Sequence, residues 1–242
     1  MLRRKFELLA AGAALAACGF VADTSAEILS NAVADGAINI DGDRSDWTSL
    51  TRYADDTNEG YANIDLGYVT MAHDSTNLYV RYQMYFPSTE FSGFYRLLLD
   101  TDQDLSTGYT GQNNAYANSV GANVYVEGAS IFEHAGATQD AFVFNYLGSA
   151  TFNNAGAGGE DVELAIPLAM IGDPSELNFV VWMDSNQSYG LEDETAPGGD
   201  DQFPNGVFNS VTNAAATYVV PEPASLMLLG LGGLALLGRT RA

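Results

Sequence analysis

Three aspartates at alternate positions, Asp100, Asp102 and Asp104, are the side chains in this sequence best suited to hold a metal ion. Clustered carboxylates repel one another unless a cation neutralises them, and carboxylate oxygens are the preferred ligands of calcium. The spacing therefore predicts a calcium site. It is not an EF-hand, because Leu105 and Gly111 stand where that motif needs Gly and Glu. A solvated acidic turn explains the same residues, and both interpretations stay open.

Four other residues are candidates for binding a carbohydrate. Sugar rings stack on flat aromatic surfaces and need hydrogen-bonding groups at the edge of the ring. Two predicted strands, over residues 77–86 and 178–183, offer polar and aromatic side chains on one face each. Packing of the same rings beneath loops is the alternative. The candidate residues are Trp182, Tyr79, Arg81 and Tyr85.

The sequence contains no recognisable catalytic arrangement. It has neither a Gly-x-Ser-x-Gly elbow nor a phosphate-binding loop, and many carboxylates but no frame that sets two of them across a cleft. Its two histidines, His73 and His134, lack the close neighbours that a zinc site requires. These observations predict a protein that is not an enzyme.

The chain is strongly acidic, with 31 Asp and Glu against 9 Lys and Arg and a formal net charge of −22. Between residues 27 and 219 the only cationic side chains besides histidine are Arg44, Arg52, Arg81 and Arg96. Such a field repels nucleic acid and anionic lipid and attracts divalent cations. Nucleic acid is therefore excluded as a partner.

The elements that must position these residues are predicted to be strands. Short runs rich in Val, Ile, Tyr and Phe alternate with clusters of Gly, Asn, Asp and Ser, which indicates an all-β domain. We expect one domain over residues 27–219, an antiparallel two-sheet β-sandwich of the jelly-roll or immunoglobulin-like kind. A helical turn is expected over 167–172. The predicted strands are 37–40, 64–72, 77–86, 93–99, 122–127, 130–133, 141–147, 161–166 and 178–183.

Alternation is clearest in the strand predicted over residues 77–86. Leu78, Val80 and Tyr82 fall on one face, and Tyr79 and Arg81 fall on the other. Period two places the first face in a core and the second near water.

Five short motifs resemble, in order, those of family-9-like carbohydrate-binding modules. They begin with Ile-Asp-Gly and Asp-Trp elements over residues 38–47 and end with Glu-x-Ala-Ile-Pro. The resemblance implies a β-sandwich with a sugar-binding role. Asn123 stands where the family has an aspartate. The five segments are 38–47, 72–80, 97–108, 121–127 and 162–167.

Residues 1–26 have the pattern of a cleaved signal peptide. Basic residues 3–5 precede an apolar stretch over 8–22, and small residues surround the expected cleavage site after Ala26. Two details leave the route open. Cys18, the only cysteine, ends a lipobox-like sequence and would be acylated in a lipoprotein, whereas the Arg-Arg-x-Phe sequence beginning at residue 3 is typical of twin-arginine export.

Residues 220–242 resemble a PEP-CTERM sorting signal. An uncharged run over 224–238, shorter than the ~20 residues of a typical membrane span, lies between a Pro-Glu-Pro triplet and a basic tail. An ordinary C-terminal membrane anchor is the alternative. The residues that carry the resemblance are Pro221, Glu222, Pro223, Arg239 and Arg241.

The sorting signal implies recognition by an exosortase-type membrane protease. The tail would hold the chain briefly in the inner membrane of a Gram-negative bacterium and be removed near the triplet, which releases the protein to the cell surface or matrix. The sequence as a whole predicts an exported, non-enzymatic protein that binds extracellular polysaccharide. A structural protein of a biofilm or surface layer and a polysaccharide-active enzyme are the alternatives.

Overall fold

The computed structural model describes residues 28–54, 66–84, 94–110, 120–155, 161–184, 200–203 and 215–220. They form short strands and two 3-10 helices. The strands are β1 (Ile28–Leu29), β2 (Tyr53–Ala54), β3 (Leu66–His73), β4 (Asn77–Met84), β5 (Phe94–Asp100), β6 (Val124–Glu127), β7 (Ser130–His134), β8 (Phe144–Ser149), β9 (Thr151–Ala155), β10 (Asp161–Pro167), β11 (Glu176–Asp184), β12 (Asp200–Phe203) and β13 (Ala216–Val219); the helices are η1 (Arg44–Trp47) and η2 (Leu168–Ile171).

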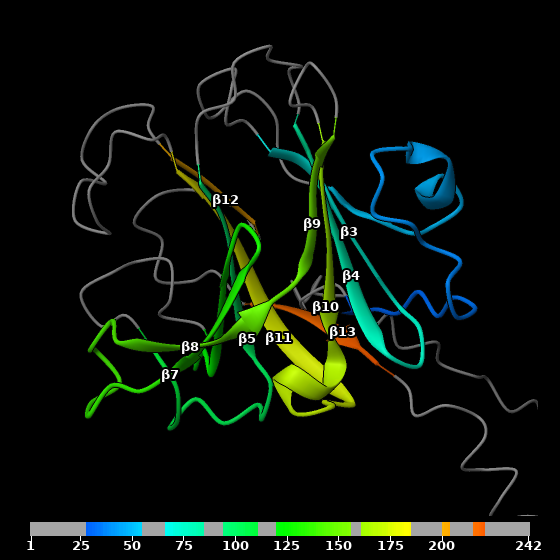
Figure 1. Cartoon of the computed structure of the whole chain (residues 1–242). Helices are drawn as coiled ribbons and strands as arrows, with labels where there is room; N and C mark the ends of the chain where they lie inside the picture. Colours follow the sequence, from blue (N-terminus) through cyan, green and yellow to red (C-terminus); the bar gives the residue numbers. More distant parts are fainter. Residues whose placement is uncertain are drawn as a thin grey trace, which may run out of the picture.

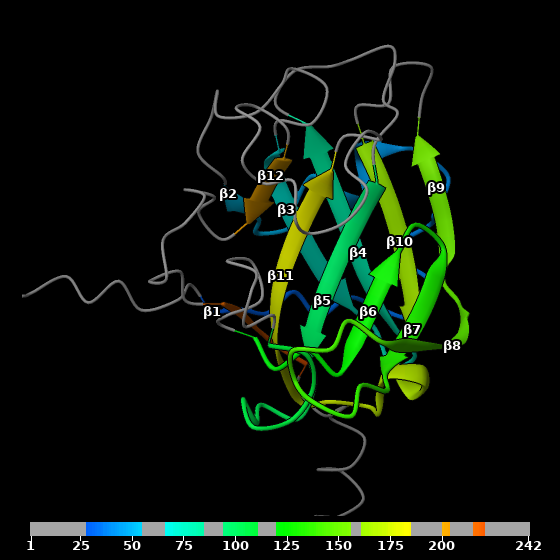
Figure 2. The same ribbon diagram turned by 90° about the vertical axis from the view of Figure 1, so that its left-hand side faces the viewer.

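The strands form two sheets that face each other (Figure 1). The eight-stranded sheet has the order β1-β13-β11-β5-β6-β7-β8, with β12 also paired to β11, and the five-stranded sheet has the order β2-β3-β4-β10-β9. Figure 2 shows the eight-stranded sheet in front of the other. The paired strands are antiparallel, except that β1 runs parallel to β13. The predicted two-sheet β-sandwich is confirmed.

The main hydrophobic core lies between the two sheets. Leu78, Val80 and Tyr82 of β4 are fully buried there, as the alternation in the sequence predicts. From the other sheet, Phe179 of β11 meets the ring of Tyr53 edge-on, with the ring centroids 5.2 Å apart. Each large apolar side chain removed from water in this way contributes roughly 1.5–3 kcal/mol. This core holds the two outer faces of the sandwich apart.

The outer face of the five-stranded sheet is covered by the chain that precedes β2 (Figure 1). Trp47 of η1 and Ile38 pack there against Tyr79 in a second apolar cluster. The prediction that Tyr79 and Arg81 lie near water is therefore wrong, because the two residues are only 4% and 6% exposed. Period two separates the two faces of a strand, but it does not show what covers each face.

The covering segment is built from turns. The predicted strand over residues 37–40 is wrong, since this stretch has no strand pairing in the structure. Asp41 and Gly42 form a tight turn, in which Asp41 accepts a hydrogen bond from the backbone N–H of Asp43 at 2.9 Å and Gly42 has a φ of 88°. Asp43 then caps η1 by accepting from the N–H of Ser45, which lowers the pKa of Asp43.

The other predicted strands are found with shifted ends, and η2 lies in the helical turn predicted over 167–172. Five strands were not predicted, namely β1, β2, β9, β12 and β13. Four of them are only two to four residues long, too short to show a period-two pattern, and three of the five residues of β9 are polar. Cys18 in the predicted signal peptide, Tyr85 and the tail over 221–242 lie outside the described residues. No helix among the described residues is long and apolar enough to cross a membrane.

Candidate functional site

Three neighbouring strands of the eight-stranded sheet bring Trp182, Arg96 and Glu127 into one row. Trp182 of β11 lies opposite Arg96 of β5, and Arg96 lies opposite Glu127 of β6. Residues directly opposite each other in antiparallel strands have Cβ atoms about 4.5–5.5 Å apart. Only the backbone of Trp182 is among the described atoms. This alignment, which we call the Trp-Arg-Glu row, places an aromatic residue beside a cation and an anion.

An ion pair fixes the two charged members of the row. Arg96 donates through Nε to Oε2 of Glu127 at 2.9 Å, and the side chains are 11% and 33% exposed. The hydroxyl of Tyr125 donates to the same carboxylate oxygen. Burial raises the pKa of Tyr125, and its bond to Glu127 raises it further, so the phenol stays a hydrogen-bond donor. The carboxylate is thus oriented and still reachable from solvent.

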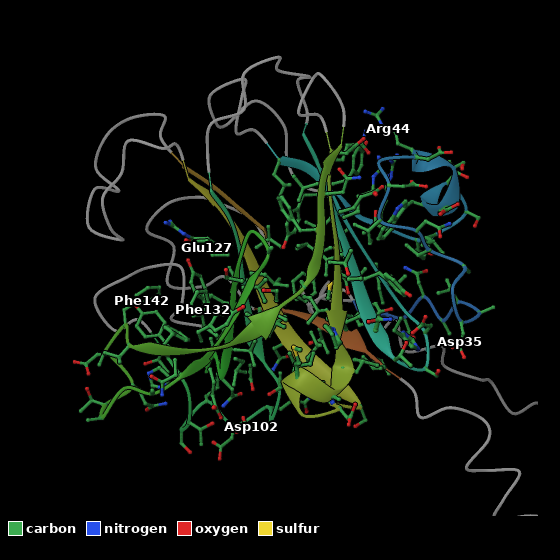
Figure 3. All side chains as sticks on the ribbon, viewed as in Figure 1. Asp35, Arg44, Asp102, Glu127, Phe132 and Phe142 are labelled. Carbon is green, nitrogen blue, oxygen red and sulfur yellow. The ribbon has the colours of Figure 1, made fainter. Side chains whose placement is uncertain are left out.

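Aromatic side chains continue the same outer face. Tyr125 packs beside Leu98 and Val180. Leu98 is two residues from Arg96 in β5, and Val180 is two residues from Trp182 in β11. Glu127, Phe132 and Phe142 lie on one flank of the sandwich (Figure 3). We call the ring cluster the aromatic shelf. Its members are Tyr109, Tyr125, Phe132, Phe142, Phe144 and Tyr146, with neighbouring ring centroids 5.0 to 6.0 Å apart.

We call this side the open face, because no helix or strand among the described residues covers it as the segment before β2 covers the opposite side. In Figure 2, β11, β5 and β6 face the viewer, and no helix or strand of the described residues lies in front of them. Phe142 and Tyr146 at the edge of the shelf are 44% and 61% exposed. An open sheet face with ordered polar groups and aromatic rings can bind an extended ligand across the strands.

Asp100 lies on the same sheet, at the end of β5, and is fully buried. It accepts a hydrogen bond from the backbone N–H of Gln103 at 2.6 Å and another from the side-chain amide of Asn178 at 3.1 Å. Burial raises the pKa of Asp100, and the neighbouring carboxylate of Asp102 raises it further, although the two hydrogen bonds oppose this rise. Two of the three predicted metal ligands therefore interact.

Asp104 is directed elsewhere in the loop. Its carboxylate accepts hydrogen bonds from the hydroxyl of Ser106 at 2.6 Å and from the backbone N–H of Ser106, which lower the pKa of Asp104. Asp102 accepts from the hydroxyl of Thr107 at 2.8 Å and from the amide of Asn123 at 3.2 Å. Across the described residues, no three His, Cys, Asp or Glu side chains gather in a group that could hold a metal ion. Calcium stays a prediction.

The loop closes on two glycines. Gly108 has a φ of +65°, and a Cβ on it would lie 2.5 Å from the backbone oxygen of Gly121. Any side chain at this position would force the two backbone segments apart. Thr107 and Gly108, which end the 97–108 segment, thus have a structural role, because Thr107 bonds Asp102 and Gly108 allows the close approach.

The predicted sugar-binding residues do not form one site. Tyr79 and Arg81 belong to β4 in the five-stranded sheet, whereas Trp182 belongs to the other sheet. Burial and the neighbouring Asp74, to which the Tyr79 hydroxyl donates at 2.6 Å, raise the pKa of Tyr79 to about 12. This ring is covered rather than presented for stacking. Tyr85 lies outside the described residues.

Sequence reasoning missed Arg96 and Glu127 as site residues. The signal available was weak: Arg96 is one of four arginines in the domain, and Tyr125 and Glu127 alternate in a predicted strand. Their pairing depends on the order of strands in the sheet, which connects residues 31 positions apart in the chain. A period-two pattern within one strand cannot indicate that order.

Comparison with known proteins gives two findings. Residues 219–242 match the model of the PEP-CTERM protein-sorting motif. The chain is also similar in structure to a family 9 carbohydrate-binding module from Caldicellulosiruptor kristjanssonii. In its complex with cellotriose the TM-score is 0.42, at 12% identity over 81% of this chain and 95% of that chain. In its complex with glucose the values are 0.43, 11%, 80% and 94%. No curated protein sequence matches the chain.

The sorting motif begins where the sandwich ends. Val219 is the last residue of β13, and the backbone N–H of Val220 still donates to Ser175 at 2.8 Å. The motif marks the chain as an exported protein that is sorted to the cell surface. The matched motif therefore begins at the last residue of β13.

Proposed function

We propose that this protein is a non-enzymatic cell-surface or matrix protein that binds extracellular polysaccharide on the open face of its eight-stranded sheet. The observation that carries the proposal is the Trp-Arg-Glu row, an aromatic residue aligned with an oriented ion pair on a face that no described element covers. The sorting motif supports the location, because a protein at the cell surface meets such polymers.

The chemistry of the row suits a sugar. A tryptophan can stack against the C–H face of a pyranose, while Arg96 and Glu127 donate to and accept from its hydroxyl groups. Hydrogen bonds to charged groups are about twice as strong as bonds between neutral groups. The aromatic shelf beside the row would let a polymer extend over further sugar residues.

Catalysis is not part of the proposal. Glycoside hydrolysis needs two carboxyl groups that flank the scissile bond. Glu127 supplies one carboxylate in the row, and it is bound in the ion pair with Arg96. We therefore expect no release of reducing ends from the host polysaccharide, and measured release would overturn this part of the proposal.

The test is a binding titration with purified exopolysaccharide of the host and with neutral oligosaccharides. The full chain is used in a non-ionic detergent without sugar groups, which would otherwise compete. We expect Trp182→Ala and Arg96→Lys each to weaken binding about tenfold or more, because the first removes the stacking ring and the second removes the planar guanidinium fork.

Met170→Ala is the control. Met170 is a large apolar residue in η2 that is 40% exposed and belongs to neither the row nor the aromatic shelf. Its variant should bind as the natural chain does. Equal binding by all variants, or no retention of any saccharide by the natural chain, would contradict the proposal; circular dichroism checks that each variant is folded.

We also propose that calcium stabilises the loop that begins at Asp100. A cation between Asp100 and Asp102 would relieve the repulsion of two adjacent carboxylates, one of them fully buried. Ligand that binds only the folded state raises the melting temperature with its concentration. We expect calcium to raise it and Asp102→Ala to abolish the rise; no change with calcium or chelator would contradict the proposal.

A structural role in a biofilm or surface layer is the second candidate. Four large apolar side chains near β8 are well exposed, and exposed apolar patches mark protein interaction sites. Calcium-dependent assembly without any effect of added sugar would favour this function over the first. The four residues are Phe142, Val143, Tyr146 and Leu147, which are 44%, 49%, 61% and 40% exposed.

For the sorting step we propose cleavage by an exosortase-type protease of a Gram-negative host, after transient anchoring in the inner membrane by residues 224–238. The matched motif over residues 219–242 supports this order of events. Mass spectrometry of the surface form should find a C-terminus near Pro221. An intact C-terminus ending at Ala242 on the mature protein would contradict it.

A further inference from the structure

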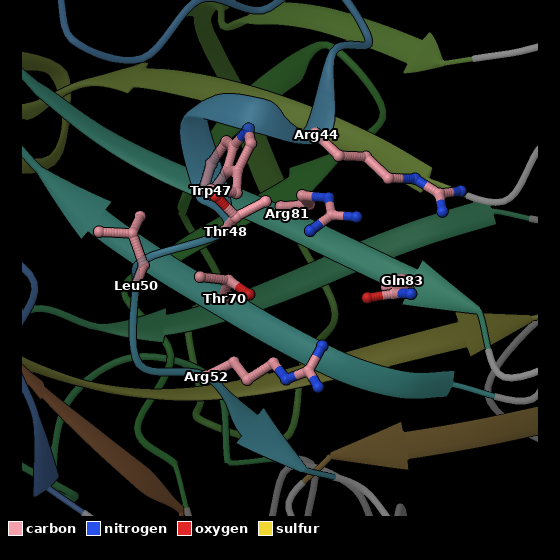
Figure 4. A pocket seen from close by; sticks show the side chains of 8 residues that line it. All are labelled: Arg44, Trp47, Thr48, Leu50, Arg52, Thr70, Arg81 and Gln83. Carbon is pink, nitrogen blue, oxygen red and sulfur yellow. The ribbon is translucent and has the colours of Figure 1, made fainter.

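A pocket of about 350 Å³ lies on the outer face of the five-stranded sheet. The covering chain supplies Arg44, Trp47 and Arg52, and the sheet supplies a floor of Thr70, Arg81 and Gln83. Figure 4 shows Thr70 and Gln83 between the guanidinium groups of Arg81 and Arg52. Pockets that bind small molecules usually measure about 300–1,000 Å³, so this one suits a single small group such as a sugar residue.

The charge of this pocket is opposite to that of the protein. The chain has a net charge of −22, yet three of the four arginines between residues 27 and 219 line this one pocket. No acidic side chain among the described residues lines it. A local concentration of guanidinium groups in an acidic protein favours an anionic ligand over a cation or a neutral molecule.

A buried ion-pair network accounts for only part of the arginines. Asp161, which is 2% exposed, accepts from Arg44 at Oδ2 and from Arg81 at Oδ1, the latter at 2.8 Å. This network ties the covering chain to the sheet. Nε of Arg81 is buried and has no hydrogen-bond partner among the described residues, so one donor at the pocket floor is left unsatisfied by them.

Arg52 is not needed for that network. Its guanidinium lies over the ring of Tyr68, 3.6 Å from the centroid, and it forms no ion pair within the described part of the chain. It is also exposed and lines the pocket. A cation held by an aromatic ring keeps its planar edge available for an oxyanion.

We infer that this pocket binds an oxyanion-bearing sugar residue, a uronate carboxylate or a sulfate ester, of an acidic polysaccharide. Arg52 and Arg81 would hold the oxyanion, Thr70 and Gln83 would bond hydroxyl groups, and Trp47 supplies an apolar wall. The inference does not rest on the Trp-Arg-Glu row, because the pocket lies on the opposite sheet. It would give the sandwich two binding faces with different ligand chemistry.

The experiment is a calorimetric titration of the full chain, in the sugar-free detergent, with three probes of equal length. They are an oligogalacturonate, a sulfated oligosaccharide and a neutral gluco-oligosaccharide. We expect Arg52→Gln to weaken binding of an acidic probe about tenfold or more, Arg52→Lys to weaken it less, and neither to change the neutral probe. The acidic probe that binds identifies the oxyanion.

Asn145→Asp is the matched control, since it lowers the net charge by one unit, as Arg52→Gln does, at an exposed position in β8. If Asn145→Asp weakened binding of the acidic probe as much as Arg52→Gln does, the loss would be explained by net charge alone, and the inference would be overturned. Absence of binding by both acidic probes, or equal affinity for acidic and neutral probes, would overturn it too. Melting temperatures of the Arg52 variants should match the natural chain, because Arg52 is exposed. Failure of the proposed binding on the eight-stranded sheet would instead appear as unchanged affinity of Trp182→Ala for the neutral probe.

Discussion

The two outer faces of this sandwich bury their charged residues to different extents. On the five-stranded sheet, Asp161 and Arg81 are enclosed beneath the covering chain, with side chains 2% and 7% exposed. On the eight-stranded sheet, Arg96 and Glu127 form a comparable pair that is 11% and 33% exposed. The same interaction thus stands in two environments.

The difference indicates what each pair does. A buried pair that loses one partner leaves a charge with no solvent to compensate it, so the enclosed pair makes the covering chain depend on the sheet. A solvent-accessible pair contributes little to folding and keeps its polar atoms available. The pair on the covered face therefore positions a segment of the chain, whereas the pair on the open face keeps polar atoms accessible, as the proposed binding there requires.

The largest expected effect is on stability. Asp161→Asn keeps the shape of the side chain but leaves Arg81 buried without its counter-charge, which should reduce the free energy of unfolding by about 3–5 kcal/mol. Glu127→Gln makes the same change on the open face and should cost about 1 kcal/mol or less. Urea denaturation of the three proteins measures both. Equal losses would mean that the faces do not differ as described.

A smaller effect is expected at the turn between β3 and β4, beneath the covering chain. Asp74 is 6% exposed and accepts from the N–H groups of Thr76 and Asn77, both at 2.8 Å. Asp74→Ala should cost about 1–3 kcal/mol, because several donors lose their acceptor. Asp104→Ala, in an exposed turn of similar design, should cost less than about 1 kcal/mol.

The contribution of Asp74 to the free energy of unfolding should depend on pH. Burial acts to raise its pKa, but hydrogen bonds from Tyr79, Thr76 and Asn77 outweigh burial and lower the pKa from 3.8 to about 2. The ionised carboxylate therefore stabilises the fold above pH 3.8, and this contribution is lost as the pH falls toward 2. The stability gap between the natural chain and Asp74→Ala should narrow over that range; a constant gap would contradict the assignment.

The sequence allowed the fold to be predicted much better than the site. Alternation in β4 correctly placed Leu78, Val80 and Tyr82 in the core, because burial of one strand face is a local property. It misplaced Tyr79 and Arg81, since the cover over Tyr79 comes from Ile38 and Trp47, 41 and 32 positions earlier in the chain, and the sequence did not show that this segment folds back over the sheet. Arg96 and Glu127 were missed for a related reason: which strands become neighbours is decided by the whole sheet.

The loop that begins at Asp100 allows a comparison between two carboxyl groups, those of Asp100 and Asp104. Asp100 should titrate above the ordinary 3.8 and Asp104 below it, because burial dominates at the first and hydrogen bonds from Ser106 dominate at the second. Carboxyl carbon NMR resolves the two titrations. Since the pKa of Asp100 is raised, its contribution to stability is present at low pH and lost as the pH rises through its folded-state pKa.

Calcium makes the same experiment sharper. A cation shared by Asp100 and Asp102 would favour their ionised forms and so lower the pH at the midpoint of the Asp100 titration. The midpoint of Asp104, whose carboxylate bonds Ser106, should move less. Identical titrations with calcium and with chelator would show that the loop is an acidic turn, closed by its own hydrogen bonds.

The smallest expected effect is at the edge of the aromatic shelf. Tyr146 is 61% exposed, and its hydroxyl bonds Ser149 at 2.7 Å on the surface. Tyr146→Ala should change the free energy of unfolding by no more than about 0.5 kcal/mol. A loss above about 1 kcal/mol would mean that the Tyr146 ring stabilises the fold through its contact with Phe132.

A small loss of stability together with altered self-assembly at high concentration would favour the surface-layer role, because the exposed Tyr146 ring would then contact another protein.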